Sequence, residues 1–357
     1  MRAAWADSSP STAPPMAETA PIAYPFAEPP APGTAVEVAP GVRWARMPLP
    51  FDLDHINLWL LEDGEASVLI DTGLANDATR ARLEQLLAAG PGPLRRVIVT
   101  HYHPDHAGNA AWLCSGRDAE LWMTRAEYLT VHAARSGTAG YSTEAQVALF
   151  RSHGLDEASG RALLARGGLY RSFVPDFPQA HRRLLEGERV AIGGREWRVM
   201  VGYGHAPEHA SLYCEALNVL VAGDMLLPRI STNVAVRPVD PGSNPLRAFL
   251  DSIARYRELP EDVLVLPSHG LPFRGAHARI ASLEAHHAAR LEELRAACAG
   301  APRSAADVLE VLFKRKLDTN QIFFAMGEAI AHLHCLYYDG RLARAVGGDG
   351  VARFASA

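Results

Sequence analysis

The chemistry-bearing residues of this chain are concentrated in one short segment, residues 97–112 (VIVTHYHPDHAGNAAW). Four apolar or β-branched residues there lead directly into His101, His103, Asp105 and His106. Neutral imidazoles and carboxylates bind divalent transition metals, and a hydrolytic metal site also leaves room for water. Alternation along an extended segment points the first two histidines the same way, and the turn after them offers the aspartate and third histidine from an adjacent direction. One loop can therefore supply two neighbouring metals; the alternative is a polar loop with incidental histidines.

Three further potential ligands each follow a predicted strand and lie beside a glycine. They are His205 in VGYGHAPEHASLY, Asp224 in NVLVAGDM and His269 in VLVLPSHG. Taken singly, Asp224 or His269 is better explained as a structural residue. Burying an unpaired Asp or His at three separate strand ends is unfavourable, however, and packing alone does not explain it. As a set that follows the first motif, the three are predicted to be metal ligands.

The elements predicted around these residues alternate between apolar strands and amphipathic helices. Asp63-Gly64 predicts a hairpin turn, and Asn76 or Asp77 predicts the cap of a helix over residues 76–89. A second helix is predicted over 244–259. The predicted strands cover residues 36–42, 56–64, 66–73, 93–101, 119–124, 189–204, 210–224 and 263–269. Strands in both halves with helices between them predict an α/β protein of the αββα sandwich type.

Composition divides the chain into three predicted parts. Residues 1–33 are rich in Pro, Ala and Ser and predict a flexible tail, within which Met16 is an alternative translation start. Residues 34–275 form the predicted catalytic domain, with a helical insertion at about 125–180. Residues 276–357 predict three helices and a hairpin, a compact appendage of winged-helix type. Ser304 is the predicted cap of the second of these helices, and Thr319 or Asn320 that of the third.

The net charge and the cysteine content limit which partners and which cellular compartment we expect. The chain has 357 residues, a net charge of -5, 48% hydrophobic residues and 21% charged residues, as in an ordinary globular protein. No apolar run is long enough to predict a membrane span, so we expect no membrane partner. The four cysteines lie far apart in no paired motif, which predicts reduced thiols and a cytoplasmic location.

Several motifs together resemble the metallo-β-lactamase fold superfamily over roughly residues 35–275. They are DTG (71–73), THYHPDH (100–106), GHAPEH (204–209), GD (223–224) and SHG (268–270). The resemblance implies one metal on His101, His103 and His205, a second on Asp105, His106 and His269, and Asp224 as the bridge. No cysteine replaces a ligand. The chain is therefore more similar to the glyoxalase II and lactonase branches than to the β-lactamases that use a cysteine there.

The resemblance also implies a mechanism. Two divalent ions, zinc by expectation with iron or manganese as alternatives, would hold a bridging hydroxide at neutral pH for attack on the substrate. Asp105 is the implied catalytic residue, which takes a proton or passes it to the leaving group. Asp71 is expected either to orient a ligand imidazole or to organise its own Asp-Thr-Gly turn. His209 is expected to support a ligand or to be structural, because Pro207 disfavours a regular helical His-x-x-x-His pair.

The residues that follow Asp224 are candidates to recognise the substrate. Arg229, Asn233 and Arg237 follow Asp224 and either grip a small acidic or amide-bearing substrate or belong to a plain exposed loop. The expected function is hydrolysis of a small ester, thioester or lactone. One alternative is an endoribonuclease or phosphodiesterase acting on single-stranded nucleic acid, and another is a non-catalytic metal-binding regulator.

Charge in the C-terminal part argues against the nucleic-acid alternative. Residues 276–357 contain ten Lys and Arg against nine Asp and Glu, a net of +1, and their one basic cluster is FKRK at 313–316. A nuclease needs a basic track along the phosphates. This part of the chain is therefore expected to pack, to close the pocket or to dimerise, and a homodimer is one arrangement that the sequence allows.

Overall fold

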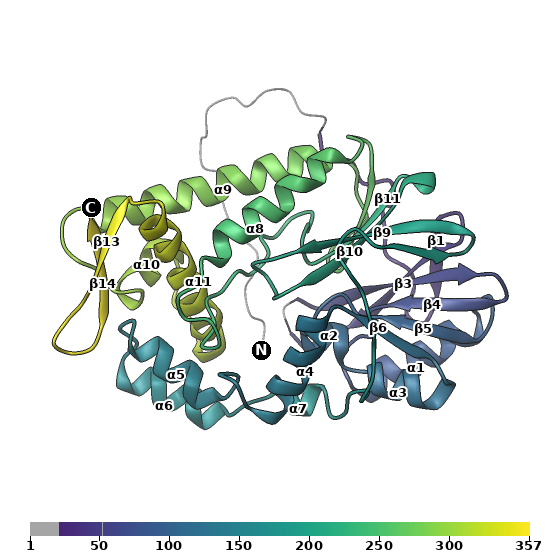
Figure 1. The fold of residues 1–357 in the computed structure, drawn as a ribbon, viewed down its shortest axis with the longest axis horizontal. Helices are drawn as coiled ribbons and strands as arrows, with labels where there is room; N and C mark the ends of the chain where they lie inside the picture. The colour runs from purple at the N-terminus through teal and green to yellow at the C-terminus, as the bar shows by residue number, and fades with distance from the viewer. Residues whose placement is uncertain (1–20, 52) are drawn as a thin grey trace. The chain divides into compact units, whose positions relative to one another are not determined.

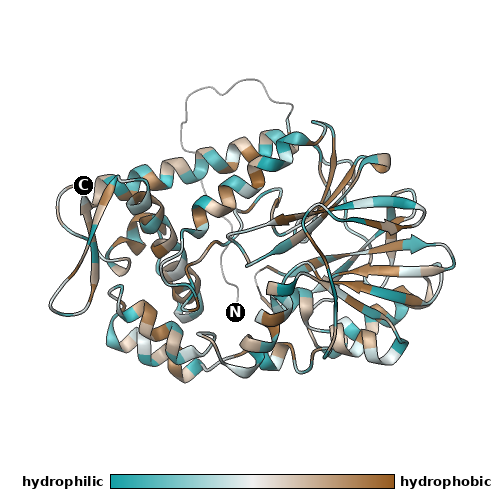
Figure 2. Ribbon diagram, viewed as in Figure 1, coloured by the Kyte–Doolittle hydropathy of each residue, from teal (hydrophilic) through white to brown (hydrophobic). Residues whose placement is uncertain are grey.

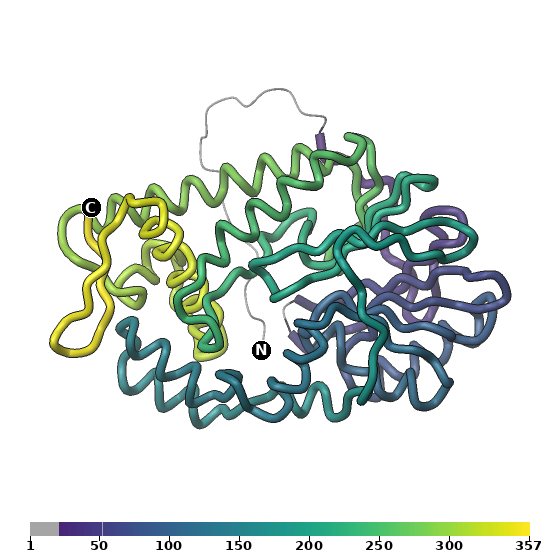
Figure 3. Tube along the Cα trace, in the orientation of Figure 1, coloured from purple at the N-terminus to yellow at the C-terminus, as the bar shows by residue number. Residues whose placement is uncertain are grey.

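The computed structural model describes residues 21–51 and 53–357, so the first twenty residues of the predicted tail, Met16 among them, lie outside the described residues. The described residues group into two compact units. The first contains the residues up to Arg135 together with Tyr170–Thr232 and Ser252–Ile280. The second contains Ser136–Leu169, Asn233–Asp251 and Ala281–Ala357. Figures 1 and 3 show the chain as a ribbon and as a tube, coloured by residue number.

A seven-stranded mixed sheet forms one layer of the first unit. Its strands are adjacent in chain order: β1 (Ala35–Ala39), β2 (Val42–Pro48), β3 (His55–Asp63), β4 (Ala66–Ile70), β5 (Leu94–Ile98), β6 (Glu120–Met123) and β7 (Arg182–Arg183). Neighbours are antiparallel as far as β4 and parallel from β4 onward. The predicted hairpin at Asp63-Gly64 is confirmed, since Asp63 of β3 pairs with Ala66 of β4.

A five-stranded sheet forms the second layer. Its strands are β8 (Arg189–Ile192), β9 (Arg195–Gly202), β10 (His209–Cys214), β11 (Val219–Gly223) and β12 (Leu264–Pro267), with the short turn η1 (Glu215–Leu217) between β10 and β11. Neighbouring strands are antiparallel except β11 and β12, which are parallel. Parallel strands end at the same edge of a sheet, so the residues after β11 and β12 are brought together.

The core of the first unit lies between the two sheets. Buried side chains from both meet there, with Trp44, Trp59 and Ile70 from the first sheet and Trp197 and Leu212 from the second. Figure 2 shows hydrophobic residues along the strands of both sheets. Burial of such side chains is the main stabilising term in folding.

Helices cover the outer faces of both sheets, which confirms the predicted αββα arrangement. On the first sheet lie α1 (Asp77–Ala88) and α3 (Ala110–Arg117), and the short α2 (Pro104–Ala107) precedes α3. Asn76 caps α1, as predicted, by accepting the N–H of Thr79. On the second sheet, the Tyr256 hydroxyl in η2 (Arg255–Glu258) lies 2.6 Å from that of Ser211. The unit also contains α4 (Arg125–Ser136) and α7 (Tyr170–Phe173).

The second unit is mostly helical. It contains α5 (Thr143–Arg151), α6 (Glu157–Arg166), η3 (Ala306–Val308), α10 (Leu309–Leu312), α11 (Thr319–Tyr338) and the hairpin of β13 (Leu342–Val346) and β14 (Ala352–Ser356). The residues of α8 (Pro245–Ala254) and α9 (Ala276–Ala297) are divided between the two units. A C-terminal helical region with a hairpin was predicted and is present. The predicted boundaries at 34–275 and 276–357 stay a prediction, and residues 136–169 group with the C-terminal helices.

Two local predictions in the C-terminal region were wrong. Ser304 does cap the segment as predicted, since its hydroxyl accepts the N–H of Asp307 at 3.2 Å, but the helix expected after it is only a 3-10 turn followed by the four residues of α10. The residues after α10, Lys314 to Lys316, are exposed, and a short helix without a buried face is not stable. The cap of α11 is Asp318 rather than Thr319 or Asn320, and Gln321 completes a capping box with it.

Two absences bear on the earlier predictions. Among the described residues, no helix is sufficiently long and apolar to cross a membrane. All four cysteines are buried free thiols.

Candidate metal centre

The ends of two parallel strands bring the first residues of the centre together. Asp71 follows β4 and His101 follows β5, one residue after Thr100. The backbone N–H of Asp71 donates to the carbonyl of Ile98 at 2.8 Å, so the two strand ends stay in register. Asp71 has a φ of 62°, a conformation that Asp and Asn adopt more readily than other side-chain-bearing residues.

The second sheet contributes its residues in the same way. Asp224 follows β11, and His269 lies two residues after β12. The backbone N–H of Ser268 donates to the carbonyl of Gly223 at 3.0 Å, which ties these two strand ends. The carbonyl of Ser268 in turn accepts the N–H of Asn57 in β3 at 2.7 Å, so this edge is also bonded to the first sheet.

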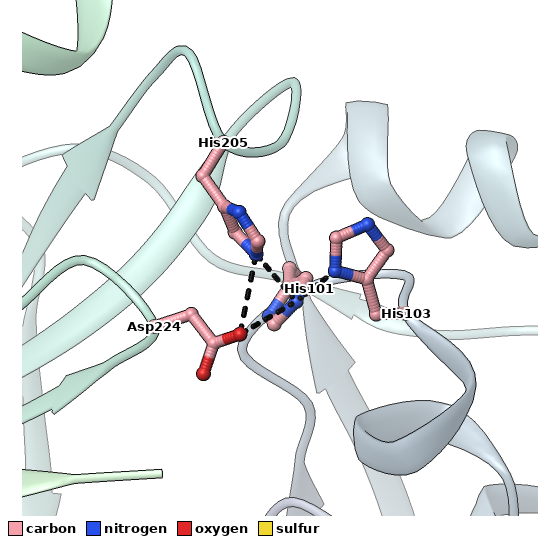
Figure 4. A group of neighbouring side chains, drawn as sticks. All are labelled: His101, His103, His205 and Asp224. Carbon is pink, nitrogen blue, oxygen red and sulfur yellow. Dashed lines mark hydrogen bonds and ion pairs between the residues drawn. The ribbon is translucent and has the colours of Figure 1, made fainter. Parts of the chain in front are cut away.

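Four side chains form a first donor group, which is drawn in Figure 4. Nε2 of His101 lies 2.8 Å from Nδ1 of His103 and 3.1 Å from Nε2 of His205. Oδ2 of Asp224 lies 3.3 Å from Nε2 of His205. A single imidazole nitrogen carries either one proton or one lone pair, so it cannot satisfy two nitrogens at once. A cation shared among them accounts for this convergence.

A second donor group contains Asp105, His106 and His269. Oδ2 of Asp105 lies 3.6 Å from Nε2 of His106 and 3.5 Å from Nε2 of His269. Oδ1 of Asp224 lies 3.5 Å and 3.3 Å from the same two nitrogens. Asp224 therefore directs one carboxylate oxygen to each group.

The ring orientation of three histidines is determined by what their Nδ1 atoms contact. Nδ1 of His106 lies 2.8 Å from Oδ2 of Asp71, and Nδ1 of His269 lies 2.8 Å from the carbonyl of His55. Nδ1 of His101 lies 3.1 Å from the hydroxyl of Thr100. A proton held on Nδ1 by a carboxylate or carbonyl leaves the lone pair on Nε2, which is the arrangement of a metal-binding histidine. All three Nε2 atoms belong to the donor groups.

The charges of the centre are strongly coupled. Burial, followed by the neighbouring imidazoles, lowers the pKa of His101 well below its usual value. Burial also opposes protonation of His106, but Asp71 and then Asp105 outweigh it and raise the pKa of His106 well above its usual value. For Asp224, burial favours the neutral acid, yet His269 and His106 outweigh burial and lower its pKa well below its usual value. The central carboxylate is thus ionised, as a metal ligand must be.

The donor set fits a pair of divalent cations. Within residues 21–51 and 53–357, the buried atoms Nε2 of His106 and Oδ1 of Asp224 have no hydrogen-bond partner. Donor atoms on a tetrahedral zinc, each about 2.0–2.1 Å from the ion, lie about 3.4 Å from one another. The spacings from 3.3 to 3.6 Å in the second group agree with that value.

His209 lies beside the first group but in neither donor group. It opens β10, is fully buried, and its Nε2 accepts the backbone N–H of Asp224 at 3.1 Å. Burial lowers its pKa to about 3, which keeps the ring neutral. A Cβ on Gly223, where φ is 57°, would lie 2.3 Å from this Nε2. Glycine is therefore needed where β11 passes the ring.

The three predicted substrate residues have other neighbours. Arg229 is exposed. Nδ2 of Asn233 donates to Oε2 of Glu328 at 3.4 Å, and Arg237 lies over the ring of Phe323 at 5.8 Å. Their role toward a substrate stays a prediction.

Sequence reasoning missed three residues that hold the donor loops. Both carboxylate oxygens of Asp71 lie 3.0 Å from the hydroxyl of Thr100, and Nε2 of His55 accepts the N–H of Gly270 at 2.8 Å. Glu127 accepts the N–H groups of Tyr102 and Glu208. Thr100 adjoins the histidine motif and was identifiable there. No sequence pattern indicates His55 or Glu127, because their partners are distant along the chain.

The chain matches two known families. Residues 51–269 match the Metallo-beta-lactamase superfamily, and residues 291–357 match the family described as Metallo-beta-lactamase-like, C-terminal domain. A curated relative, the probable metallo-hydrolase YqjP of Bacillus subtilis (strain 168), is 28% identical over 299 residues, which are 82% of this chain and 90% of that protein.

Solved structures agree with this assignment. A beta-lactamase domain protein from Burkholderia ambifaria is 49% identical with a TM-score of 0.87, over 94% of this chain and 98% of that one. A metallo-beta-lactamase family protein from Thermus thermophilus, TTHA1429, is 32% identical with a TM-score of 0.76, over 90% of this chain and 100% of that one.

Proposed function

The chain belongs to the metallo-beta-lactamase superfamily and is a metal-dependent hydrolase, and from that premise we propose that it uses two divalent ions to cleave a small ester, thioester or lactone. The observation that carries the proposal is the placement of Asp224. Its two carboxylate oxygens face two separate donor groups, each within 3.3 Å of a histidine nitrogen. One carboxylate between two such groups supports a bridged pair of ions rather than a single one.

The proposed division of ligands follows the two groups. His101, His103 and His205 would hold one ion, Asp105, His106 and His269 the other, and Asp224 both. Imidazole and carboxylate ligands accept zinc, iron and manganese, and of these we propose zinc, with iron or manganese as alternatives. When bound, such a pair lowers the pKa of a shared water and supplies hydroxide at neutral pH.

Asp105 is the proposed proton carrier. Its side chain is more accessible than that of Asp224, with 19% exposed against 10%, and it approaches His106 and His269 through one oxygen only. An aspartate with an uncommitted oxygen at the edge of the site can accept a proton from the attacking water and deliver it to the leaving group. Asp224, which faces both groups, has no oxygen to spare for that task.

The charge of the chain and its thiols support the remaining assignments. A small-molecule substrate without nucleic-acid or membrane partners is consistent with the net charge of -5, and Arg229, Asn233 and Arg237 are candidates to contact it. Four buried free thiols favour the cytoplasm. We also propose that the C-terminal helices and hairpin are of winged-helix type and that a homodimer is the assembly.

Metal analysis and a substrate panel test the proposal. Purified protein is expected to contain two equivalents of a divalent metal and to hydrolyse a member of a panel of acyl thioesters, lactones and aryl esters. His103→Ala should lower turnover by at least about 100-fold, since even the partners of metal ligands typically contribute about 10–100-fold. The matched control is His286→Ala on α9, outside both donor groups, which should retain activity.

Other outcomes would redirect the assignment. Cleavage of single-stranded RNA with a steep salt dependence, and no turnover of the acyl panel, would favour the ribonuclease alternative. One metal equivalent would contradict the bridging role of Asp224. Wild-type turnover after complete removal of metal would contradict the proposed mechanism altogether.

A further inference from the structure

Glu127 is a buried carboxylate outside the donor groups, and no family motif assigns it a role. It is the third residue of α4, and its side chain is 0% exposed. Burial raises its pKa to about 8, against the opposing effect of two backbone hydrogen bonds. Burying a carboxylate costs free energy unless hydrogen bonds compensate for the lost hydration. The partners of these hydrogen bonds therefore indicate what the residue contributes.

The two oxygens of Glu127 accept hydrogen bonds from two ligand-bearing loops. Oε2 accepts the backbone N–H of Tyr102 at 2.8 Å, and Oε1 accepts the backbone N–H of Glu208 at 2.6 Å. Tyr102 is the residue between His101 and His103. Glu208 lies in the loop that begins with His205 and ends at the start of β10. A single carboxylate therefore connects a loop of the first sheet with a loop of the second.

The start of α4 reinforces the same connection. The hydroxyl of Thr124 donates to the carbonyl of Glu208 at 2.8 Å. The carboxylate of Glu208 in turn accepts the N–H of Ala126 at 3.1 Å. The first turn of α4 and residue 208 are thus joined by three hydrogen bonds, and Glu127 extends the network to Tyr102.

Ordinary helix capping does not account for these contacts. An acidic residue in the first turn is favoured by the helix dipole wherever it points. The oxygens of Glu127 bond to N–H groups outside α4, however, whereas Glu208 serves an N–H of the helix itself. The ligands on either side, His103 and His205, have ring centroids 4.6 Å apart.

We propose that Glu127 is a positioning residue that holds the His101–His103 loop and the His205 loop at the spacing required to bind metal in the first donor group. The inference rests on the proposed metal function but does not depend on which substrate is hydrolysed. The carboxylate acts through the backbone of the neighbours of the ligands and does not contact an ion. Besides Glu127, the backbone N–H of Ala210 donates to the carbonyl of Thr100 at 2.9 Å, but that bond lies at the far end of each loop from His103 and His205.

Metal affinity of the folded chain tests this role. Glu127→Gln keeps the size of the side chain, but its amide nitrogen cannot accept an N–H, so at least one of the two hydrogen bonds is lost. Zn²⁺ or Co²⁺ affinity, measured by competition with a chromophoric chelator, is expected to fall about 10–100-fold for the first donor group. The visible absorption of the Co²⁺ protein should change as the ligand geometry relaxes.

Two further variants make the test specific. Glu127→Asp keeps two carboxyl oxygens on a shorter side chain that reaches one donor, and it should lose less affinity than Glu127→Gln. If Glu127→Gln does not fold, the metal affinity of Glu127→Asp is compared with that of the wild type instead. Glu144→Gln removes an exposed acidic residue from the first turn of α5 and should change neither affinity nor spectrum.

The outcomes separate positioning from a merely structural role. A structural role lowers the urea midpoint of the metal-free protein but leaves the metal dissociation constant and the Co²⁺ spectrum of the folded protein unchanged, and that result would overturn the inference. If no acyl substrate is turned over by the wild type, the proposed function fails, while the affinity comparison still decides the role of Glu127.

Discussion

Each histidine of the centre is useful only if it presents the correct ring nitrogen. Nδ1 of His106 is held by Asp71, and Nδ1 of His269 by the carbonyl of His55, so both rings direct Nε2 to Asp224. A carboxylate partner also makes the imidazole more basic and a stronger ligand. Asp71 therefore orients an imidazole of the second donor group without belonging to either group.

Asp71→Asn is predicted to weaken metal binding with little change in the backbone. Asparagine tolerates the φ of 62° at this position, so the turn is retained. Asparagine has only one acceptor oxygen and no charge. It can accept a hydrogen bond from the N–H of Thr100 or from Nδ1 of His106, but it cannot replace both carboxylate oxygens. The expected loss is about 10–100-fold in affinity for Zn²⁺, measured by chelator competition. The control Asp77→Asn alters an exposed acid nearby and should have no effect; equal affinities for both variants would argue that Asp71 only shapes its turn.

At the scale of helices and strands, termini decide where each functional residue is placed. Three ligands, His101, Asp224 and His269, follow strand ends, as does Asp71, and the parallel pairs β4–β5 and β11–β12 bring those ends together. Helix starts follow local hydrogen bonding, which a sequence pattern locates to within a residue or two. The start of α11 shows this limit, because the cap is Asp318 although Thr319 and Asn320 are also good capping residues.

Asp318→Ala is predicted to reduce the free energy of unfolding by about 1 kcal/mol, because it removes the acceptor for the N–H of Gln321 and breaks the capping box. The change would be measured from urea unfolding curves monitored by circular dichroism. Thr319→Ala and Asn320→Ala serve as matched controls on the same turn and should cost clearly less. A larger loss for Thr319→Ala or for Asn320→Ala would show that the helix begins one or two residues later, respectively, than described.

At the scale of the whole molecule, buried histidines make stability depend on pH. Burial lowers the pKa of His153 and of His332 to about 4, and nearby His334 and His286 respectively add to the effect. The unfolded chain, with a histidine pKa of about 6.5, binds more protons than the folded chain between pH 6.5 and 4. The contribution of these two histidines to the free energy of unfolding is therefore fully present above pH 6.5, and it is lost as the pH falls from 6.5 to 4.

The metal-free protein is accordingly predicted to unfold at lower urea concentration at pH 4.5 than at pH 7. Each of these histidines contributes a slope of up to about 1.4 kcal/mol per pH unit within the window. His153→Asn removes one titrating group while its amide can still donate to the carbonyl of Leu149, as Nδ1 of His153 does at 2.9 Å. The variant should show a shallower pH dependence. A parallel curve would mean that His153 is protonated alike in both states.

Most of the architecture followed from local pattern. Alternating apolar residues predicted the strands, Asp63-Gly64 predicted the hairpin, and Asn76 predicted a helix start, because each depends on neighbours along the chain. The histidine motif likewise specified metal chemistry within one loop. The helix expected after Ser304 ends at Leu312, because the residues that would continue it, Lys314 to Lys316, are exposed and bury no further apolar face.

The sequence by itself determined which residues could bind metal and which sheets would carry them. Only the tertiary structure decided that His55 holds His269 and that Glu127 joins two loops. These contacts link residues far apart along the chain. They depend on strand register and on how two sheets pack, which no spacing within a single segment encodes.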